Sequence, residues 1–360
     1  MSRFIDISLS RDCCAAMRGL AIVAIVLHNY CHLLPGTLDE NEFEYFQRNA
    51  DGFIRALTAS GHLLIDVLSF AGWYGVPVFM FLTGYGLVRK YETGGAPFGR
   101  VMFLRESFRK LFCLLLPGTV LVVATLAAVI VSYGNIPGVR LFASQLFQLT
   151  MLPDLVYPFA PPSPGVYWYF GLTMQFYVIY AFLIYRRPAW WMAVAVTVSL
   201  VCQELLAGEP DGLAWFRHNS TGWVMVLAIG VMYGRTASVP LTIAAVVPPL
   251  SAIVFVPSML DGSTWQISLA AAVLLAVTAG RLTMLIPVWR DVWIWFGRMS
   301  PFLFAAHPVV RLWFFQAMPG QQPSLAVLAV YFAACIVAAL GYRRLWVFTR
   351  AGVARLVPAQ

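Results

Sequence analysis

The sequence predicts an all-α, polytopic integral membrane protein, and three observations lead to this prediction. Hydrophobic residues make up 60% of the 360 residues and charged residues only 11%, which leaves too little polar surface to cover a water-soluble globule. The apolar residues gather in runs of about 20, the length of a helix that crosses a bilayer. Basic residues gather in alternate connections between these runs, as is typical of multi-pass membrane proteins.

Ten apolar runs are predicted to form transmembrane helices. They lie near 14–34, 63–87, 111–133, 165–185, 189–206, 221–234, 238–258, 265–286, 293–317 and 324–342. The run at 221–234 is short for a span, and 141–157 would suit an interfacial or re-entrant helix, so counts of nine and eleven also stay open. No repeat or low-complexity segment divides the chain, which predicts a single membrane domain over residues 1–360.

The basic residues predict the orientation of these helices. If the amino end of the first helix lies in the cytoplasm, most of the 24 Lys and Arg residues lie on that side, and the exceptions are Arg48, Arg55, Arg140, Arg217 and Arg311. This asymmetry predicts that both termini are cytoplasmic. The net charge of +8 then reflects topology and contact with anionic membrane lipids, and no nucleic-acid partner is expected. The six cysteines show no metal-ligand spacing, so neither a metal nor a disulfide is expected.

Ionisable residues inside the first apolar run are the strongest functional signal. Arg18, His28 and His32 lie in this run, and a titratable group at bilayer depth usually faces a protein interior or a wet cavity and marks function. His32 follows His28 by four residues, so both imidazoles point the same way on a helix. Histidine has the near-neutral pKa that a general base needs. Arg18 lies nearer the cytoplasmic end, where it would meet an anionic ligand or pair with Asp12.

A second charged group precedes the third span. Arg105 and Arg109 stand four residues apart on one helical face, and two neighbouring guanidiniums suit a phosphate or pyrophosphate. The alternative is ordinary anchoring on the positive side of the membrane, helped by an ion pair between Glu106 and Lys110.

Five segments, in a fixed order along the chain, resemble a known family. They are Arg18-Gly-Leu-Ala-Ile with a histidine later in the same helix, Gly75-Val-Pro-Val-Phe-Met-Phe-Leu-Thr-Gly-Tyr85, the pair Arg105 and Arg109, Tyr167-Trp-Tyr-Phe-Gly-Leu-Thr-Met-Gln-Phe-Tyr177, and Gly297-Arg-Met-Ser-Pro-Phe-Leu-Phe-Ala-Ala-His307. Together they resemble the membrane acyltransferase-3 family, the O-acyltransferases of extracytoplasmic glycans. The resemblance covers the whole chain.

The resemblance implies a function, a donor and an acceptor. The donor would be cytoplasmic acyl-CoA, usually acetyl-CoA, bound near Arg105 and Arg109, with Arg18 on the same side. A first-helix histidine would act as base or as transient acyl carrier, and the acceptor would be a hydroxyl of an extracytoplasmic or lipid-linked glycan. The resemblance implies a multi-pass protein of the bacterial inner membrane without a metal. It is compatible with a homo-oligomer.

The first helix departs from the family pattern by one residue. Ten residues commonly separate the family's arginine and histidine, whereas nine separate Arg18 from His28, and Asn29 occupies the expected position. On a helix of about 100° per residue, the side chain of His28 lies about 80° around the helix axis from that of Arg18, and the side chain of His32 lies about 40° from it. Both histidines therefore stay candidates for the catalytic residue.

A second departure concerns the second span. Pro77 stands where many relatives carry an acid, and Asp66 is a candidate substitute that would contact substrate. Asp66 follows His62 by four residues, so the alternative is a buried pair in which the two side chains only satisfy each other.

Four other polar or aromatic residues of the family motifs are candidates for contact with the sugar. They are Trp168, Gln175, Tyr177 and His307. Aromatic residues can stack on a sugar, but they also anchor helices at the membrane interface. His307 would equally form a packed polar pair with Arg311.

A proton-coupled secondary transporter of a small solute is the rival prediction. Intramembrane Arg, His and Asp residues suit such a carrier. A carrier should show two matching halves, however, and the first five predicted spans do not correspond to the last five.

Overall fold

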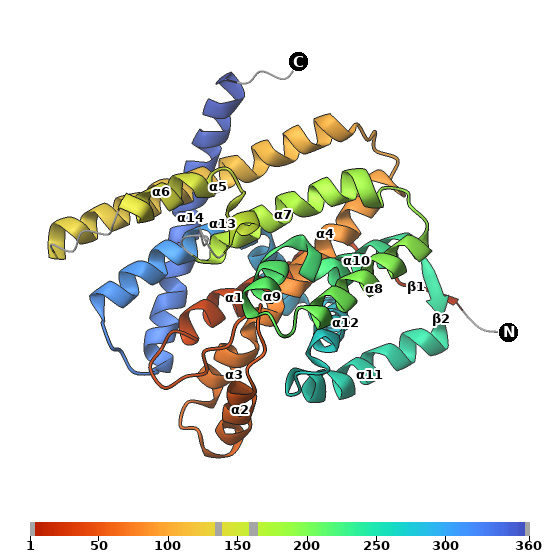
Figure 1. The fold of residues 1–360 in the computed structure, drawn as a ribbon, viewed down its shortest axis with the longest axis horizontal. Coiled ribbons are helices and arrows are strands. Elements are labelled where there is room, and N and C mark those ends of the chain that lie inside the picture. The colour runs from red at the N-terminus through yellow and green to blue at the C-terminus, as the bar shows by residue number, and fades with distance from the viewer. Residues whose placement is uncertain (1–3, 134–138, 158–164, 357–360) are drawn as a thin grey trace.

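The computed structural model describes residues 4–133, 139–157 and 165–356, and nearly all of them belong to helices (Figure 1). In these ranges the only strands are β1 (Phe4–Asp6) and β2 (Ser238–Pro240), which form one antiparallel pair with Phe4 opposite Pro240. The prediction of an all-α fold is confirmed.

The helices follow one another along the chain with short connections. The α-helices are α1 (Arg11–Cys31), α2 (Gln47–Ala59), α3 (Leu63–Ala71), α4 (Gly75–Tyr91), α5 (Arg100–Tyr133), α6 (Val139–Gln148), α7 (Trp168–Ile179), α8 (Ala189–Leu205), α9 (Pro210–His218), α10 (Val224–Arg235), α11 (Leu241–Met259), α12 (Trp265–Thr283), α13 (Pro287–Ala317) and α14 (Leu325–Leu356). Short 3₁₀ turns are η1 (Gly72–Tyr74), η2 (Pro153–Val156), η3 (Gly165–Tyr167) and η5 (Ser220–Trp223), and a π-helical turn, η4 (Tyr180–Ile184), extends α7.

Each predicted span falls on a helix, and the second falls on α3, η1 and α4 in succession. Within the described ranges, seven helical segments are long and apolar enough to cross a membrane. The protein is therefore a multi-pass membrane protein. The remaining predicted spans correspond to α8, α10 and α13. At 17 and 12 residues, α8 and α10 are shorter than the roughly 20 residues of a full span. The count of ten and the cytoplasmic termini stay predictions.

Helix α1 lies in the middle of the bundle (Figure 1), and glycines allow its neighbours to pack directly on its backbone. A Cβ at Gly19 would overlap the carbonyl oxygen of Trp293 on α13, and a Cβ at Gly297 would overlap that of Ala15. On α4, a Cβ at Gly75 would overlap a backbone carbonyl of α1. Small residues are the usual means of such close approach between membrane helices. They fix α1 between α13 and α4.

The sequence sets both ends of α1. The Ser10 hydroxyl accepts a hydrogen bond from the Cys13 N–H at 3.0 Å and caps the amino end. The helix ends before Pro35, and Gly36 has a φ of 78°, which glycine adopts without strain. The chain then folds back over the end of α1 as residues 37–46, which we call the α1–α2 loop.

Candidate active site

Two adjoining cavities lie along one face of α1. The first, which we call the basic cavity, has a volume of about 330 Å³, and its polar lining residues are Arg18, Thr83, Lys90, Ser107 and Lys110, with the tyrosines Tyr91 and Tyr177. The second, the central cavity, has a volume of about 410 Å³ and reaches the α1–α2 loop. Both are lined by Arg18, Phe79, Thr83, Leu111 and Tyr177. The two cavities therefore form one path whose midpoint is Arg18.

Arg18 is the cation at the junction of the two cavities. Its Nε is buried and has no hydrogen-bond partner in the described part of the chain. Asp12, the acid that the sequence offered as a partner, lies 3.6 Å from Arg298 instead. Among the described residues no carboxylate forms an ion pair with Arg18, so its guanidinium is available to an anionic ligand.

Asn29 of α1 lines the central cavity, nearer than Arg18 to the carboxyl end of the helix. Asn29 follows Arg18 by eleven positions, which places the two side chains within about 20° of each other around the helix. Its Nδ2 donates to the Ile25 carbonyl at 3.0 Å, and its Oδ1 accepts from Arg311 Nη1 at 3.2 Å. The resemblance to the acyltransferase-3 family predicts a histidine at this position, and this chain has Asn29 there.

His28 and His32 lie together beside the cavities, and neither is part of the lining. Their ring centroids are 4.6 Å apart. Nδ1 of His28 lies 3.2 Å from the Leu68 carbonyl oxygen, and Nδ1 of His32 lies 3.1 Å from that of Glu40. Both Nε2 atoms are buried without a hydrogen-bond partner among the described residues. The catalytic role of either histidine stays a prediction.

Glu42, on the α1–α2 loop, is the only carboxyl group in the described lining of the central cavity. Its Oε1 accepts a hydrogen bond from Trp168 Nε1 at 2.9 Å. Burial raises the pKa of the Glu42 carboxyl, and the charge of Arg311 opposes this shift. A raised pKa makes the ionised carboxylate a stronger proton acceptor than that of an exposed glutamate, which is the property that a general base needs. The sequence analysis did not single out this residue.

Contacts to α9 hold the α1–α2 loop in place next to Glu42. Arg217 Nη1 donates to the Phe43 carbonyl at 2.8 Å. The Phe43 ring stacks on His218 with centroids 3.6 Å apart and meets Trp168 edge-on at 4.8 Å. Burial lowers the pKa of His218 to about 4, so this ring stays neutral and stacks as an aromatic group.

The predicted sugar-contacting residues of α7 divide into two groups. Trp168 lines the central cavity and Tyr177 lines both cavities. Gln175 lines neither cavity. Its Nε2 donates to Asn219 Oδ1 at 2.8 Å, and its Oε1 accepts from the Ser220 N–H at 2.9 Å. Gln175 therefore ties α7 to the α9–α10 connection.

Asp66 and His307 also lie outside the lining of both cavities. The Asp66 carboxylate accepts a hydrogen bond from the Ser60 hydroxyl. His62 is exposed, and no ion pair joins it to Asp66 in the described ranges, so the alternative of a buried pair is wrong. His307 is fully buried with its Nδ1 3.1 Å from the Leu303 carbonyl oxygen.

Apart from Arg18, the cations that line the basic cavity differ from those predicted. Lys90 and Lys110 line it, whereas Arg105 and Arg109 lie on the same helix as Lys110 but outside the lining. Lys110 lies 3.8 Å from Glu106, which confirms the expected i,i+4 pair. The four-residue spacing of Arg105 and Arg109 predicts only cations on α5, so it could not identify Lys90, which lies on α4.

The buried carboxyl group of Glu40 gives a prediction about stability. Only 2% of Glu40 is exposed, Asn49 Nδ2 donates to its Oε2 at 2.8 Å, and burial raises its pKa to about 8. The fold therefore favours the protonated carboxyl, and this stabilisation is lost as the pH rises from below 4.5 through about 8. Glu40→Gln keeps the acceptor for Asn49 without the charge, so we expect its Tm to exceed that of the wild type at pH 9 more than at pH 5.

Scanning fluorimetry in detergent would measure this difference. The control is Glu204→Gln, because Glu204 is exposed. A difference in Tm between Glu40→Gln and the wild type that is the same at pH 5 and pH 9 would contradict the prediction.

Comparison with known proteins identifies the family of this chain. A family model described as an acyltransferase domain matches residues 14–343, which include most of α1, the lining of both cavities and all five motif segments. No curated protein and no solved structure shows a significant match. The match to the family model covers nearly the whole chain, and the protein therefore belongs to the membrane acyltransferase-3 family.

Proposed function

We propose that this protein is an O-acyltransferase of the bacterial inner membrane that transfers an acyl group, usually acetyl, from cytoplasmic acyl-CoA to a hydroxyl of an extracytoplasmic or lipid-linked glycan. The observation that carries this proposal is the path formed by the two cavities. Cations lie at one end of the path, and a carboxyl group with aromatic side chains lies at the other.

The basic cavity suits the donor. Coenzyme A carries several phosphate groups, and Lys90, Lys110 and Arg18 offer ammonium and guanidinium donors to them. This end of the protein is the one that the positive-inside rule places in the cytoplasm. Arg105 and Arg109 lie on the same helix as Lys110, and in this proposal they contact the part of coenzyme A that stays outside the cavity.

The central cavity suits the acceptor and the chemistry. Trp168 and Tyr169 line it and offer aromatic faces to a sugar ring. In the proposed reaction, Glu42 removes the proton of the acceptor hydroxyl while the hydroxyl oxygen attacks the thioester carbonyl. A carbon–oxygen bond forms, the carbon–sulfur bond breaks, and the proton finally returns to the coenzyme A thiolate.

The alternative catalyst is the first-helix histidine predicted from the sequence, as base or as transient acyl carrier. His28 and His32 both have a buried Nε2 without a hydrogen-bond partner among the described residues, and this is the atom that either role requires. The observation that favours Glu42 is its place in the cavity lining, where α1 contributes Asn29. The transporter alternative has no such support, because the chain belongs to an acyltransferase family.

Acyl transfer by the purified protein tests the proposal. The protein would be reconstituted in proteoliposomes with radiolabelled acetyl-CoA and a pool of glycan acceptors. Wild type would be compared with His28→Ala, His32→Ala, Glu42→Gln and the double variant Arg105→Ala/Arg109→Ala. We expect transfer by the wild type and its loss in Glu42→Gln. Loss in a histidine variant together with full activity of Glu42→Gln would assign catalysis to that histidine. Absence of transfer to any acceptor would overturn the proposed function.

A further inference from the structure

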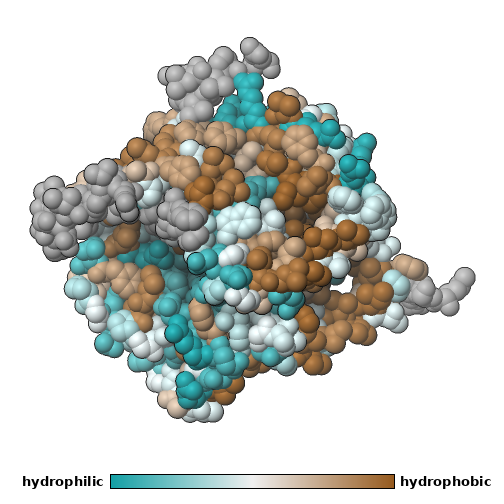
Figure 2. Space-filling view, in the orientation of Figure 1, coloured by the Kyte–Doolittle hydropathy of each residue, from teal (hydrophilic) through white to brown (hydrophobic). Residues whose placement is uncertain are grey.

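A third and larger hollow, which we call the lateral groove, shares no lining residue with the basic cavity or the central cavity. Its volume is about 800 Å³, and its walls come from α8, α10, α11, α12 and the segment around Ile7. Figure 2 shows brown, apolar side chains around an opening on the side of the molecule where α8 and α11 face each other. The groove is thus separate from the proposed route of acyl transfer.

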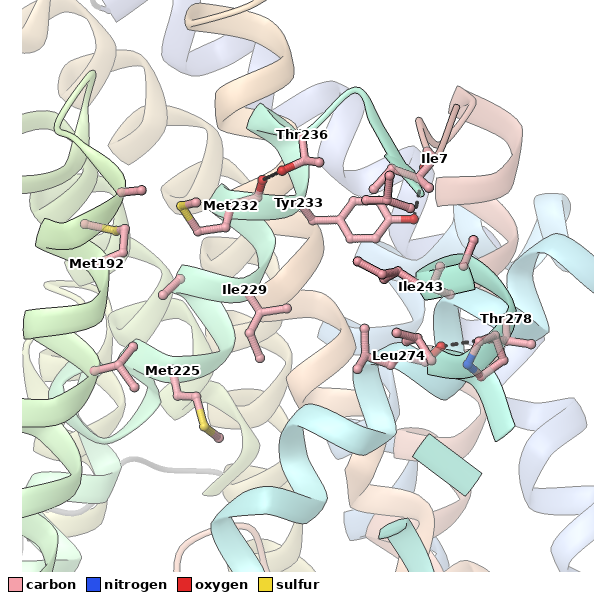
Figure 3. Close-up of a pocket in the computed structure, with 18 of the residues that line it drawn as sticks. Ile7, Met192, Met225, Ile229, Met232, Tyr233, Thr236, Ile243, Leu274 and Thr278 are labelled. Atoms are coloured by element: carbon pink, nitrogen blue, oxygen red, sulfur yellow. Dashed lines mark hydrogen bonds between the residues drawn. The ribbon is translucent and has the colours of Figure 1, made fainter. Parts of the chain in front are cut away.

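The wall of the lateral groove is almost entirely apolar. Met192, Met225, Met232 and Ile229 extend into it from α8 and α10 (Figure 3). Methionine side chains are flexible and adapt to ligands of irregular shape. Two of the threonine hydroxyls in the wall are already bonded to backbone carbonyls: Thr236 donates to Met232 at 2.9 Å, and Thr278 donates to Leu274 at 3.0 Å. The groove therefore offers hydrocarbon surface to an occupant along most of its length.

One charged residue, Arg281, lies in the otherwise apolar wall, at one end of the groove. Arg281 lines the groove at the end of α12, and its Nη2 donates to the Ile7 carbonyl at 2.6 Å and to the Tyr233 hydroxyl at 3.2 Å. Both contacts use the same nitrogen. Asp6 is near enough to feel the charge of Arg281, but no carboxylate forms an ion pair with Arg281 in the described ranges. Its remaining N–H groups are thus available to an anion at the mouth of an apolar groove.

Two arginines lie at or near this end of the groove. Arg235 and Arg281 lie at the ends of α10 and α12, next to the paired strands β1 and β2. Arg235 is already paired with Glu92 at 2.8 Å, so Arg281 is the cation left for a ligand. The positive-inside rule places this end at the cytoplasmic leaflet, where anionic lipids are concentrated and basic pockets between helices bind their head groups.

We propose that the lateral groove is a binding site for an anionic phospholipid of the cytoplasmic leaflet, with an acyl chain lying between α10 and α11 and the phosphate against Arg281. Helix α11 packs mainly against α12, and only 11% of its apolar window is buried within the protein. The lipid chain fills the space between α11 and the rest of the bundle. The lipid is therefore a structural ligand that joins α11 to the segment around Ile7 through Arg281.

Lipid binding by the full-length protein tests this proposal. Native mass spectrometry would count bound phosphatidylglycerol and phosphatidylcholine of equal chain length on the wild type, Arg281→Gln, Arg281→Lys and Arg290→Gln. Arg290 is the matched control, because it lies at the start of α13, is paired with Asp291 and does not line the groove. We expect the wild type and Arg290→Gln to prefer phosphatidylglycerol by about 10-fold, Arg281→Lys to keep part of this preference, and Arg281→Gln to lose it.

A second variant tests the apolar part of the groove. Ala244→Phe places a ring in the groove from α11, and we expect it to lower phosphatidylglycerol binding while Arg281 is intact. Equal binding of the two lipids to the wild type would overturn the proposal, as would an unchanged preference in Arg281→Gln. Displacement of phosphatidylglycerol by a polyprenyl phosphate at equal concentration would also overturn it, because the occupant would then be a single-chain isoprenoid. Loss of acyl transfer would not affect this result, since the readout is lipid binding alone.

Discussion

Replacing Glu42 with glutamine is expected to lower kcat for acyl transfer by about 10²- to 10⁴-fold, the usual contribution of a positioned general base. Glutamine has the same size and retains an oxygen that can accept the hydrogen bond from Trp168 Nε1. It cannot take a proton from the acceptor hydroxyl. Because the change removes basicity and leaves the cavity shape intact, KM for acyl-CoA should change little.

The pH dependence of the rate provides a second readout for the same variant. Burial raises the pKa of Glu42, and the ionised carboxylate is the form that accepts a proton. The wild-type rate should therefore fall as the pH drops through this raised pKa, at a higher pH than for an exposed glutamate, and the fall should be absent from Glu42→Gln. Glu44→Gln, two residues along the same loop and outside the cavity lining, is the control. A Glu42→Gln enzyme with wild-type kcat would contradict the assignment.

Replacing Arg18 with glutamine is expected to raise KM for acyl-CoA by about 10- to 100-fold, which corresponds to the loss of a charge-assisted hydrogen bond. Arg18 lies where the two cavities meet and has no ion-pair partner among the described residues. An anionic donor would therefore be the group that its charge stabilises. Isothermal titration with coenzyme A measures the effect directly, and raising the salt concentration should weaken binding to the wild type more than to Arg18→Gln.

The matched control for this experiment is Arg11→Gln. Arg11 lies at the start of the same helix, is exposed and does not line the cavities. It should bind coenzyme A as the wild type does. Equal affinity of Arg18→Gln and the wild type would show that the donor does not reach the junction of the two cavities.

The helices could be predicted from the sequence because runs of apolar residues determine them. Each predicted span falls on a helix, and the glycines of the first and ninth spans explain how α1 and α13 come together. The exposure of Arg18 to a cavity inside the bundle could also be predicted, since a charged side chain is costly in lipid. The helical phase of Arg18 would also have identified Asn29, which lies on the same face as Arg18 and lines the cavity, whereas His28 does not.

Glu42 could not be identified in this way. The α1–α2 loop carries several acids, among them Asp39, Glu40 and Glu44, and nothing in their order indicates which one enters the bundle. The choice is made by long-range contacts to Trp168, which is 126 positions away along the chain, and to Arg217 on α9. Lys90 was missed for the same reason, because α4 and α5 form one cavity from distant segments. Side-chain convergence of this kind depends on tertiary packing.

In the proposed mechanism, the acyl group travels along the path formed by the basic and central cavities. Thr83 lines both cavities, so Thr83→Trp places a large ring at their junction. The most direct test compares transfer of radiolabelled acetyl from acetyl-CoA to glycan by the wild type, Thr83→Trp and Thr349→Trp, a control on α14 that lines neither cavity. We predict that Thr83→Trp still binds coenzyme A but loses acetyl transfer, while Thr349→Trp transfers acetyl as the wild type does. Full transfer by a folded Thr83→Trp protein would contradict transfer of the acyl group along this path.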